Sequence, residues 1–137
     1  MRIKLFCLFL CLLPWVSFAQ TTPQKGNATY YAKSHVGHKT TSGERYNPNE
    51  MTAAHATLPM HSYVQVHNLG NGRSVVVRIN DRMSRKSRYV IDVSKKAARE
   101  LGIVGAGSGK VTLTKVDKET ALAFYRKASK AHEQDNR

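Results

Sequence analysis

Acidic residues are scarce in this chain. It contains 9 Asp plus Glu against 22 Lys plus Arg, and its formal net charge is +13 at pH 7. Few carboxylates are therefore available for acid–base chemistry, and each can be considered individually. The excess of positive charge attracts polyanions without specifying which, and it is equally consistent with a basic surface that only aids solubility.

Cysteines and long apolar runs are also nearly absent. Both cysteines, Cys7 and Cys11, lie in the first 19 residues, where two basic residues precede an apolar run that ends in Ser-Phe-Ala at 17–19. This pattern is typical of a cleaved secretory signal, and the run is shorter than the roughly 20 residues that span a bilayer. We expect export across the inner membrane to the periplasm or beyond the cell, with no membrane anchor after cleavage.

The length of the mature chain indicates a single domain. Removing 19 of the 137 residues leaves 118, enough to bury a core without disulfides. We expect residues 20–26 to form a polar tether and residues 27–116 to form the folded domain. Residues 117–137 are expected to form a C-terminal helix with a polar tail, and the protein is expected to be a monomer.

Short alternating segments separated by turn residues dominate the folded part. YVQVHNL, GNG and RSVVVRIND follow one another over residues 63–81, which predicts a β-hairpin with a tight glycine turn. Ser94 and Gly102 have the residue types of an N-cap and a C-cap, which predicts a short helix between them. Further strands are predicted at 27–34, 88–94 and 109–116. Together these elements favour a compact, mostly β barrel.

Asp81 lies at the end of the second predicted hairpin strand, in the stretch RINDRMSR. If the alternation continues, its side chain shares a face with Val75, Val77 and Ile79 and points to the apolar side. Partial burial would raise its pKa, and the neighbouring arginines would lower it. The pattern leaves open which effect is larger, and whether Asp81 is a turn or ion-pair residue or a catalytic group.

Four segments of the sequence together resemble the rare lipoprotein A (RlpA-like) family of double-psi β-barrels. They are TSGERY, MTAAHATLP, VHNLGNGRSVVVRINDR and IDVSKKAARELG, and they occur in this order between residues 26 and 116. The resemblance implies a mainly β fold: a six-stranded double-psi β-barrel with short helices and a C-terminal helix. It also implies a bacterial cell-wall protein.

The resemblance further implies a peptidoglycan lytic transglycosylase, a lyase whose partner is the glycan strand. Such an enzyme cleaves MurNAc–GlcNAc bonds of peptide-free strands and leaves 1,6-anhydroMurNAc ends. A carboxylic acid protonates the leaving oxygen, and as a base it deprotonates the muramic C6 hydroxyl, which attacks its own anomeric carbon. The functional residues of the family map onto Glu44, His55 and Asp81, and we expect Asp81 to be the acid/base.

The other expected site residues have less specific roles. Glu44 would stabilise the positive charge that develops on the sugar ring, or it would orient the substrate. Alternatively, it is a solvated loop acid. His55 would hydrogen-bond a carboxylate, or it is a buried structural histidine. Thr41, Ser42 and Tyr46 are expected to contact sugar, because hydroxyl groups bond sugar hydroxyls and an aromatic ring can lie against a pyranose face.

Other site types are not expected. His35 and His38 are close in sequence, but without a cysteine or an HExxH pattern we expect no metal and no cofactor. Asp92 is interpreted as a structural residue that caps or braces the following helix. Nucleic acid is not expected as a partner, because no RNA-binding signature or basic helix occurs.

Two alternatives to an enzyme stay open. The first is a non-catalytic, expansin-like module that binds peptidoglycan or another polysaccharide, because a shared fold does not guarantee catalysis. The weaker second alternative is a basic nucleic-acid or inhibitor-type module.

Overall fold

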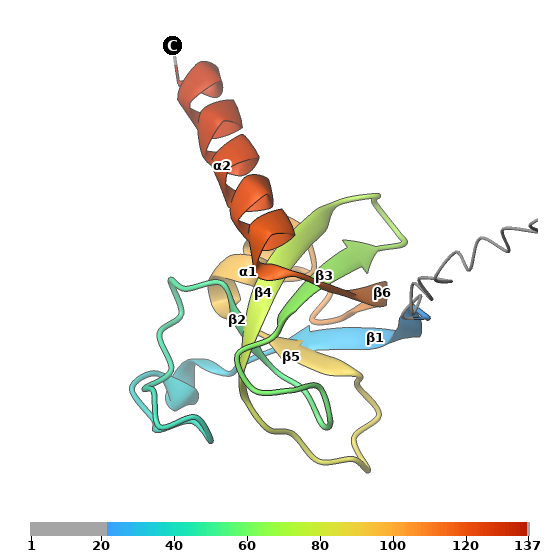
Figure 1. Cartoon of the computed structure of the whole chain (residues 1–137). Helices are drawn as coiled ribbons and strands as arrows, with labels where there is room; N and C mark the ends of the chain where they lie inside the picture. Colours follow the sequence, from blue (N-terminus) through green and yellow to red (C-terminus); the bar gives the residue numbers. More distant parts are fainter. Residues whose placement is uncertain (1–21, 137) are drawn as a thin grey trace, which may run out of the picture.

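Six strands close into one barrel in the computed structural model, which describes residues 22–136. The expected leader and both cysteines lie outside the described residues. The strand order around the barrel is β1-β5-β2-β4-β3-β6, with two parallel and four antiparallel neighbours (Figure 1). The strands are β1 Gln24–Tyr30, β2 Thr52–Ala54, β3 Tyr63–Asn68, β4 Ser74–Asp81, β5 Ile91–Val93 and β6 Gly109–Val116. The mainly β, six-stranded barrel is therefore confirmed.

The predicted hairpin is present as β3 and β4. The two strands pair antiparallel from Tyr63 opposite Arg78 to His67 opposite Ser74. The turn between them uses a positive φ of 74° at Gly72, which glycine adopts without steric cost. β6 covers the same residues as the strand predicted at 109–116 and pairs with the other edge of β3.

The first and fifth strands differ from their predicted bounds. β1 begins at Gln24, so residues 24–26, which had been assigned to the tether, pair with β6. It ends at Tyr30, and a 3-10 helix, η1 Lys33–His35, follows in place of the predicted strand end. Only residues 91–93 of the predicted strand at 88–94 belong to β5. Short β-branched and aromatic runs predict that a strand exists better than they predict where it ends.

Helix α1, Lys95–Leu101, packs against the barrel. Ser94 caps it by accepting a hydrogen bond from the Ala97 backbone N–H at 3.3 Å, and Gly102 ends it with a left-handed φ of 76°. The predicted caps are therefore confirmed. The helix contributes Ala97, Ala98 and Leu101 to a core that also contains valines and isoleucines from β3, β4 and β5. Each large buried aliphatic side chain stabilises the fold by about 1.5–3 kcal/mol.

Helix α2, Lys118–Asp135, projects away from the barrel (Figure 1). Asp117 caps it by accepting a hydrogen bond from the Thr120 backbone N–H at 2.7 Å. The helix contacts the barrel through buried Ala121 and through the Tyr125 hydroxyl, which donates to the Val76 carbonyl at 2.9 Å. Within residues 22–136, neither helix combines the length and the apolar character that crossing a bilayer requires.

A β-bulge changes the direction of the Asp81 side chain. β2 and β4 pair with Ala53 opposite Ile79, but Ala54 lies opposite Asp81, so Asn80 is the extra residue. Ala53 belongs to the barrel core, whereas Ala54 belongs to a separate cluster with Tyr31 and Tyr46. Asp81 hydrogen-bonds to Tyr31 in this second cluster. The expectation that Asp81 points the same way as Ile79 is therefore wrong, because the bulge reverses the alternation.

Candidate functional site

Both carboxylate oxygens of Asp81 are held by hydrogen bonds. Oδ2 accepts from the Tyr31 hydroxyl at 2.6 Å. Oδ1 accepts from the Thr41 backbone N–H at 2.9 Å, from the Thr41 hydroxyl at 2.8 Å and from the Arg82 backbone N–H at 2.8 Å. The residue remains partly exposed. The side chain therefore has a fixed orientation at the end of β4.

The charge state of Asp81 follows from these contacts. Burial favours the neutral acid and raises its pKa, but the hydrogen bonds from Tyr31, Thr41 and Arg82 favour the carboxylate and together outweigh burial. The pKa of Asp81 is therefore below its usual value, and the group is ionised at neutral pH. The sequence had left this balance open, and hydrogen-bond donors, rather than the charges of neighbouring arginines, decide it.

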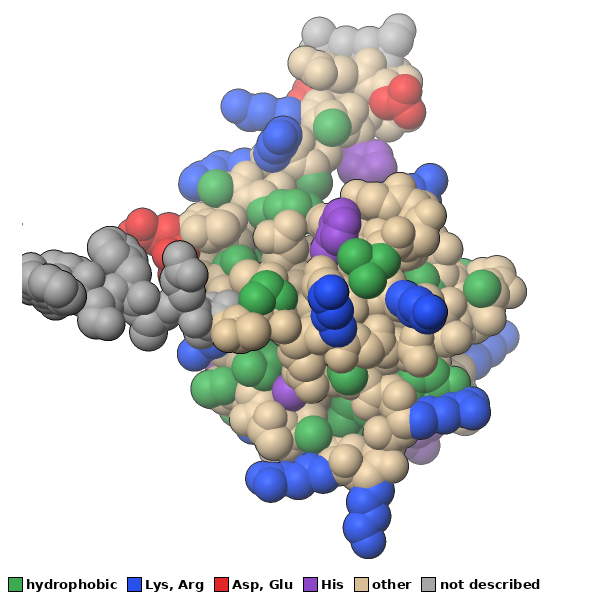
Figure 2. Space-filling model, turned by 90° about the vertical axis from the view of Figure 1, so that its right-hand side faces the viewer, with side chains coloured by type: hydrophobic (Ala, Val, Ile, Leu, Met, Phe, Trp, Pro, Cys, Tyr) green, Lys and Arg blue, Asp and Glu red, His purple; other side chains and the backbone are tan. Residues whose placement is uncertain are grey.

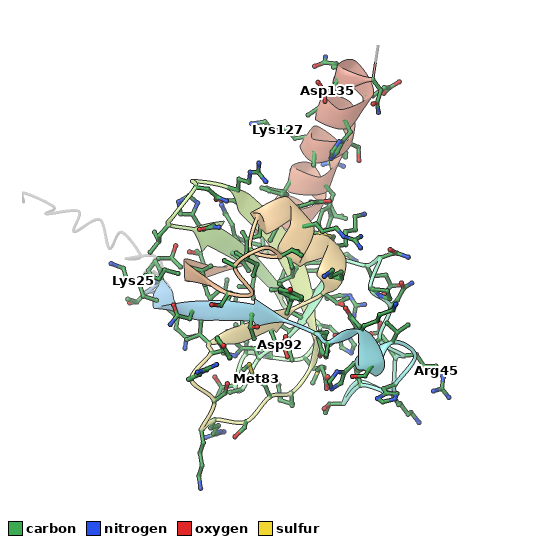
Figure 3. All side chains as sticks on the ribbon, turned by 180° about the vertical axis from the view of Figure 1, so that it is seen from behind. Lys25, Arg45, Met83, Asp92, Lys127 and Asp135 are labelled. Atoms are coloured by element: carbon green, nitrogen blue, oxygen red, sulfur yellow. The ribbon has the colours of Figure 1, made fainter. Side chains whose placement is uncertain are left out.

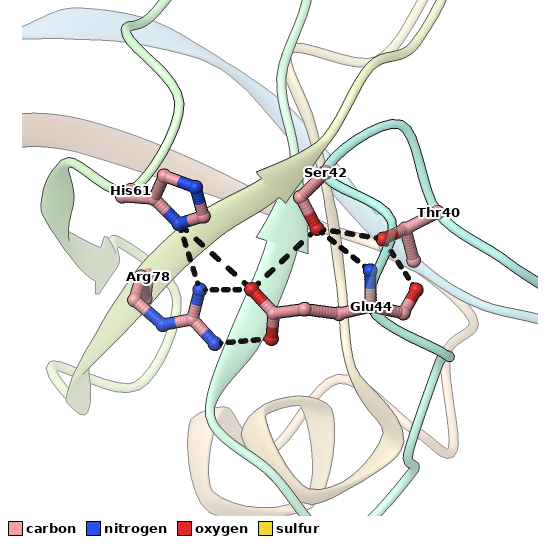
Figure 4. A network of polar contacts seen from close by, with 5 residues as sticks. All are labelled: Thr40, Ser42, Glu44, His61 and Arg78. Atoms are coloured by element: carbon pink, nitrogen blue, oxygen red, sulfur yellow. Dashed lines mark hydrogen bonds and ion pairs between the residues drawn. The ribbon is translucent and has the colours of Figure 1, made fainter.

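Glu44 forms a second carboxylate site with Arg78 and His61 (Figure 4). The two terminal nitrogens of the Arg78 guanidinium donate to the two Glu44 oxygens at 2.7 Å each. His61 Nδ1 accepts from Arg78 at 3.1 Å and lies 3.8 Å from Glu44 Oε1. The hydrogen bonds from Arg78 lower the pKa of Glu44, against a smaller opposing effect of burial. Glu44 is therefore a paired acid and not a freely solvated loop residue.

The loop at residues 40–44 connects the two carboxylates. Thr41 donates twice to Asp81, and the Ser42 hydroxyl lies 3.5 Å from Glu44 Oε1. The loop is closed on itself because the Thr40 hydroxyl donates to the Glu44 carbonyl at 2.7 Å, and it is tied to β4 because the Ser42 N–H donates to the carbonyl of residue 80 at 3.1 Å. The structure thus brings Thr41, Ser42, Glu44 and Asp81 together at the end of β4.

Among residues 22–136, the hydrogen-bond partners of the His55 side chain include no carboxylate. Its side chain is buried, Nε2 lies 2.9 Å from Gln24 Oε1, and Nδ1 accepts from the backbone N–H groups of Thr57 and Leu58. Burial lowers the pKa of His55, and the charge of Arg82 lowers it further. These contacts correspond to the alternative of a neutral structural histidine. The His55 backbone N–H also donates to the Asp81 carbonyl at 3.2 Å, so His55 helps to fix the backbone of the site.

Tyr46 also differs from its expected role as a sugar contact. It is 4% exposed, and its ring stacks on Tyr31 with centroids 4.3 Å apart. Its hydroxyl accepts a hydrogen bond from the Lys95 backbone N–H at 3.1 Å. Because the ring face is covered, Tyr46 supports Tyr31, and through it Asp81, and does not present a platform to a pyranose ring.

Asp92 is an additional carboxylate of this site. Asp92, labelled in Figure 3, lies on β5. Asp92 and Asp81 on β4 both lie opposite Ala54, so the two aspartates flank one alanine in the same row. Within the described residues, Asp92 Oδ1 is the buried side-chain atom that lacks a hydrogen-bond partner. Burial raises the pKa of Asp92 to about 6; the charge of His35 opposes this, and that of Asp81 adds to it. Ser94, and not Asp92, caps the following helix.

Sequence reasoning missed three further residues of the site. Tyr31 lies in the strand predicted at 27–34, and Arg78 is one of the arginines near Asp81, but neither is expected to contact a site carboxylate. His61 has a positive φ of 66°, an unfavourable conformation for a non-glycine residue. No local signal links these residues to Asp81 or Glu44, because their partners are 17 to 50 positions away.

No metal centre is evident in the described part of the chain. Within residues 22–136, no three His, Cys, Asp or Glu side chains are grouped closely enough to hold a metal ion. The rings of His35 and His38 lie edge to face, with centroids 5.9 Å apart.

A closed barrel of six mixed strands, with hydrogen-bonded acids at one strand end, defines a double-psi β-barrel with a carboxylate site. Within this class, the chain belongs to the RlpA-like family. The family model described as lytic transglycolase matches residues 23–113. The chain is 50% identical over 93 residues to the endolytic peptidoglycan transglycosylase RlpA of Neisseria meningitidis. The match covers 68% of this chain and 39% of that protein, so the chain spans less than half the length of this relative.

Two solved structures share the fold. The Streptomyces papain inhibitor has a TM-score of 0.57 at 22% identity, over 72% of this chain and 98% of the inhibitor. The expansin of Clavibacter michiganensis has a TM-score of 0.57 at 20% identity, over 71% of this chain and 52% of the expansin. At these identities the similarity establishes the fold alone.

Proposed function

We propose that the chain is an endolytic peptidoglycan transglycosylase. In this proposal it cleaves MurNAc–GlcNAc bonds of peptide-free glycan strands and leaves 1,6-anhydroMurNAc ends. Membership of the RlpA-like family and the name of the Neisseria relative support the reaction class. The observation that carries the proposal for this chain is the pair of aspartates across Ala54, whose environments shift their pKa values in opposite directions.

The reaction needs one proton donor and one proton acceptor. The bond between the muramic C1 and the leaving oxygen breaks, that oxygen takes a proton, and the muramic C6 oxygen loses a proton as it bonds to C1. No water is consumed, because the nucleophile is part of the substrate and therefore has a high effective concentration. Two carboxyl groups with separated pKa values can divide these roles.

Asp81 and Asp92 are suited to these two roles. A single carboxylate that acts first as acid would have to be protonated, which the four hydrogen bonds to Asp81 disfavour. Asp92 holds a proton below a pH of about 6. We assign Asp81 as the group that contacts the sugar and accepts the C6 hydroxyl proton, and Asp92 as the source of the proton for the leaving oxygen.

The remaining residues have supporting roles in this proposal. Arg78 balances the charge of Glu44. We therefore assign Glu44 to orienting sugar hydroxyls and not to stabilising positive charge on the sugar ring. His55 is a positioning residue that acts through the backbone of Asp81. Thr41 and Ser42 hold the carboxylates and offer their hydroxyls to the substrate.

Location and domain organisation follow the same proposal. Residues 1–19 would be a secretory signal, and the barrel together with α2 would act as a monomer in the periplasm or outside the cell. Peptidoglycan is found there, and the excess of positive charge in the chain would favour its attachment to the anionic cell wall.

The Asp81→Asn variant tests the assignment. With peptide-free glycan as substrate, mass spectrometry should detect anhydro-ended fragments from the wild type and none above background from the variant. The Asp135→Asn variant, which changes an exposed acid at the far end of α2, should cleave like the wild type. Absence of anhydro products from the wild type would refute the proposed function.

A second candidate is a non-catalytic polysaccharide-binding module. This candidate is favoured because both oxygens of Asp81 and both oxygens of Glu44 already accept hydrogen bonds within the protein. In that case purified cell-wall sacculi would sediment the wild type and the Asp81→Asn variant equally, and neither would release fragments.

A further inference from the structure

A cavity of about 400 Å³ lies between η1 and the start of α1. Three tyrosines and three cationic side chains contribute to its lining: Tyr30, Tyr31, Tyr46, Lys33, Lys95 and Arg99. Tyr31 also donates the hydrogen bond to Asp81 Oδ2, so the cavity adjoins the proposed site through one side chain. A cavity of this size is large enough for a small ligand or for part of a polymer chain.

The charges around this cavity are not compensated. Its lining contains no Asp or Glu. Lys33 and Arg99 are exposed and form no ion pair with an acid in residues 22–136, and Lys95 Nζ lies 4.6 Å from the centre of the Tyr30 ring. Lys and Arg side chains are spread over the face of the molecule shown in Figure 2. The cavity combines aromatic walls with three cations that form no ion pair with an acid within residues 22–136.

The chemistry of the lining indicates the kind of ligand. The cations favour an anionic group, and the aromatic edges of the tyrosines favour the body of a sugar. We propose that this cavity binds the free carboxylate of a sugar residue in the glycan strand. The inference rests on the proposed function, and it would explain a preference for peptide-free strands. Removal of a stem peptide converts the neutral amide on muramic acid into a carboxylate, which places a negative charge next to the sugar ring, where these cations can reach it.

Binding measurements on two chemically matched glycans test the inference. One probe is a peptide-free glycan fragment with free carboxylates, and the other is the same fragment after conversion of its carboxylates to methylamides. Calorimetry is performed with the full chain carrying Asp81→Asn, which blocks turnover and leaves every cation in place. The carboxylate form should bind about tenfold more tightly than the methylamide, an effect of the size expected for a few partly exposed ion pairs.

Two triple variants in the same background provide the comparison. Lys33→Gln, Lys95→Gln and Arg99→Gln together should reduce the tenfold preference to about onefold. The matched control removes the same charge at exposed positions outside the cavity, through Lys110→Gln, Lys115→Gln and Lys127→Gln, and should keep the preference. If the cavity triple variant does not fold, single changes at the exposed Lys33 and Arg99 should each remove part of the preference.

Several outcomes would overturn the inference. These are equal binding of both probes by the parent chain, no binding of either probe, and an undiminished preference in the folded cavity variant. Stronger competition by inorganic phosphate than by acetate would also overturn it, because it would indicate a phosphate site. Binding is measured in the Asp81→Asn background, and product release is measured with the wild type, so the two tests are independent. A carboxylate preference together with no anhydro products from the wild type would refute only the proposed function. Cleavage without a carboxylate preference would refute only this inference.

Discussion

The burial of Asp92 predicts that the protein is less stable at neutral pH than it would be with a neutral side chain there. Asp92 lies on β5, and its Oδ1 is buried without a hydrogen-bond partner. At pH 7, above its pKa of about 6, most of this carboxyl group is ionised in a poorly solvated position close to a second charged aspartate, Asp81, and the protonated minority is the form proposed to donate a proton. Asparagine has almost the same shape and no charge. Asp92→Asn should therefore stabilise the fold while removing the proposed proton donor.

The size of this effect on the unfolding free energy follows from the shifted pKa of Asp92. Burial raises the pKa of Asp92 from 3.8 to about 6, so between these pH values the folded chain binds more protons than the unfolded chain. Stability therefore falls as the pH rises through this window and does not recover above it. The cost at pH 7 is about 3 kcal/mol. In a domain of this size, its removal should raise Tm by roughly 10 °C.

Thermal and urea unfolding of wild type and Asp92→Asn between pH 3.5 and 7.5 measure this effect. The two curves of unfolding free energy should converge near pH 4 and separate as the pH rises to about 6. Asp135→Asn, at an exposed position, serves as the control and should follow the wild type. Equal stability of wild type and Asp92→Asn at pH 7 would contradict the proposed burial of a charge. Full glycan cleavage by Asp92→Asn would contradict its role as proton donor.

Three other substitutions test individual contacts, two at the site and one in the packing of the barrel. Tyr31→Phe removes the 2.6 Å hydrogen bond to Asp81, so the pKa of Asp81, followed by carboxyl NMR, should rise, and the unfolding free energy should fall by about 1–3 kcal/mol. Arg78→Gln should lower cleavage by releasing Glu44, but it should cost at most about 1 kcal/mol in urea unfolding because the pair is partly exposed. Gly26→Ala would place a β-carbon against a methyl group of Val90, closer than packing allows, and urea unfolding should show a loss of about 1–3 kcal/mol with no direct effect on the site.

The parts of the fold that could be predicted depend on local patterns. The β3–β4 hairpin follows from alternating residues on either side of a glycine turn, and α1 follows from a serine N-cap and a glycine C-cap. Strand bounds such as the start of β1 at Gln24 depend on pairing with β6, more than 80 positions away, and no local pattern encodes this partner. The order of the strands was available only through the resemblance to a family.

The candidate site shows the same division between local and distant causes. Asp81 could be identified from its position after an apolar strand, but its direction could not, because a single extra residue, Asn80, reverses the side-chain alternation. Its charge state depends on donors from Tyr31 and Thr41, which are 50 and 40 positions away. Asp92 acquires its raised pKa mainly from burial when β5 pairs with β2 in the barrel, and the charge of Asp81, across Ala54, adds to it. The residue types were therefore visible in the sequence, whereas the environments on which their proposed division into proton acceptor and proton donor rests depend on the closure of the barrel.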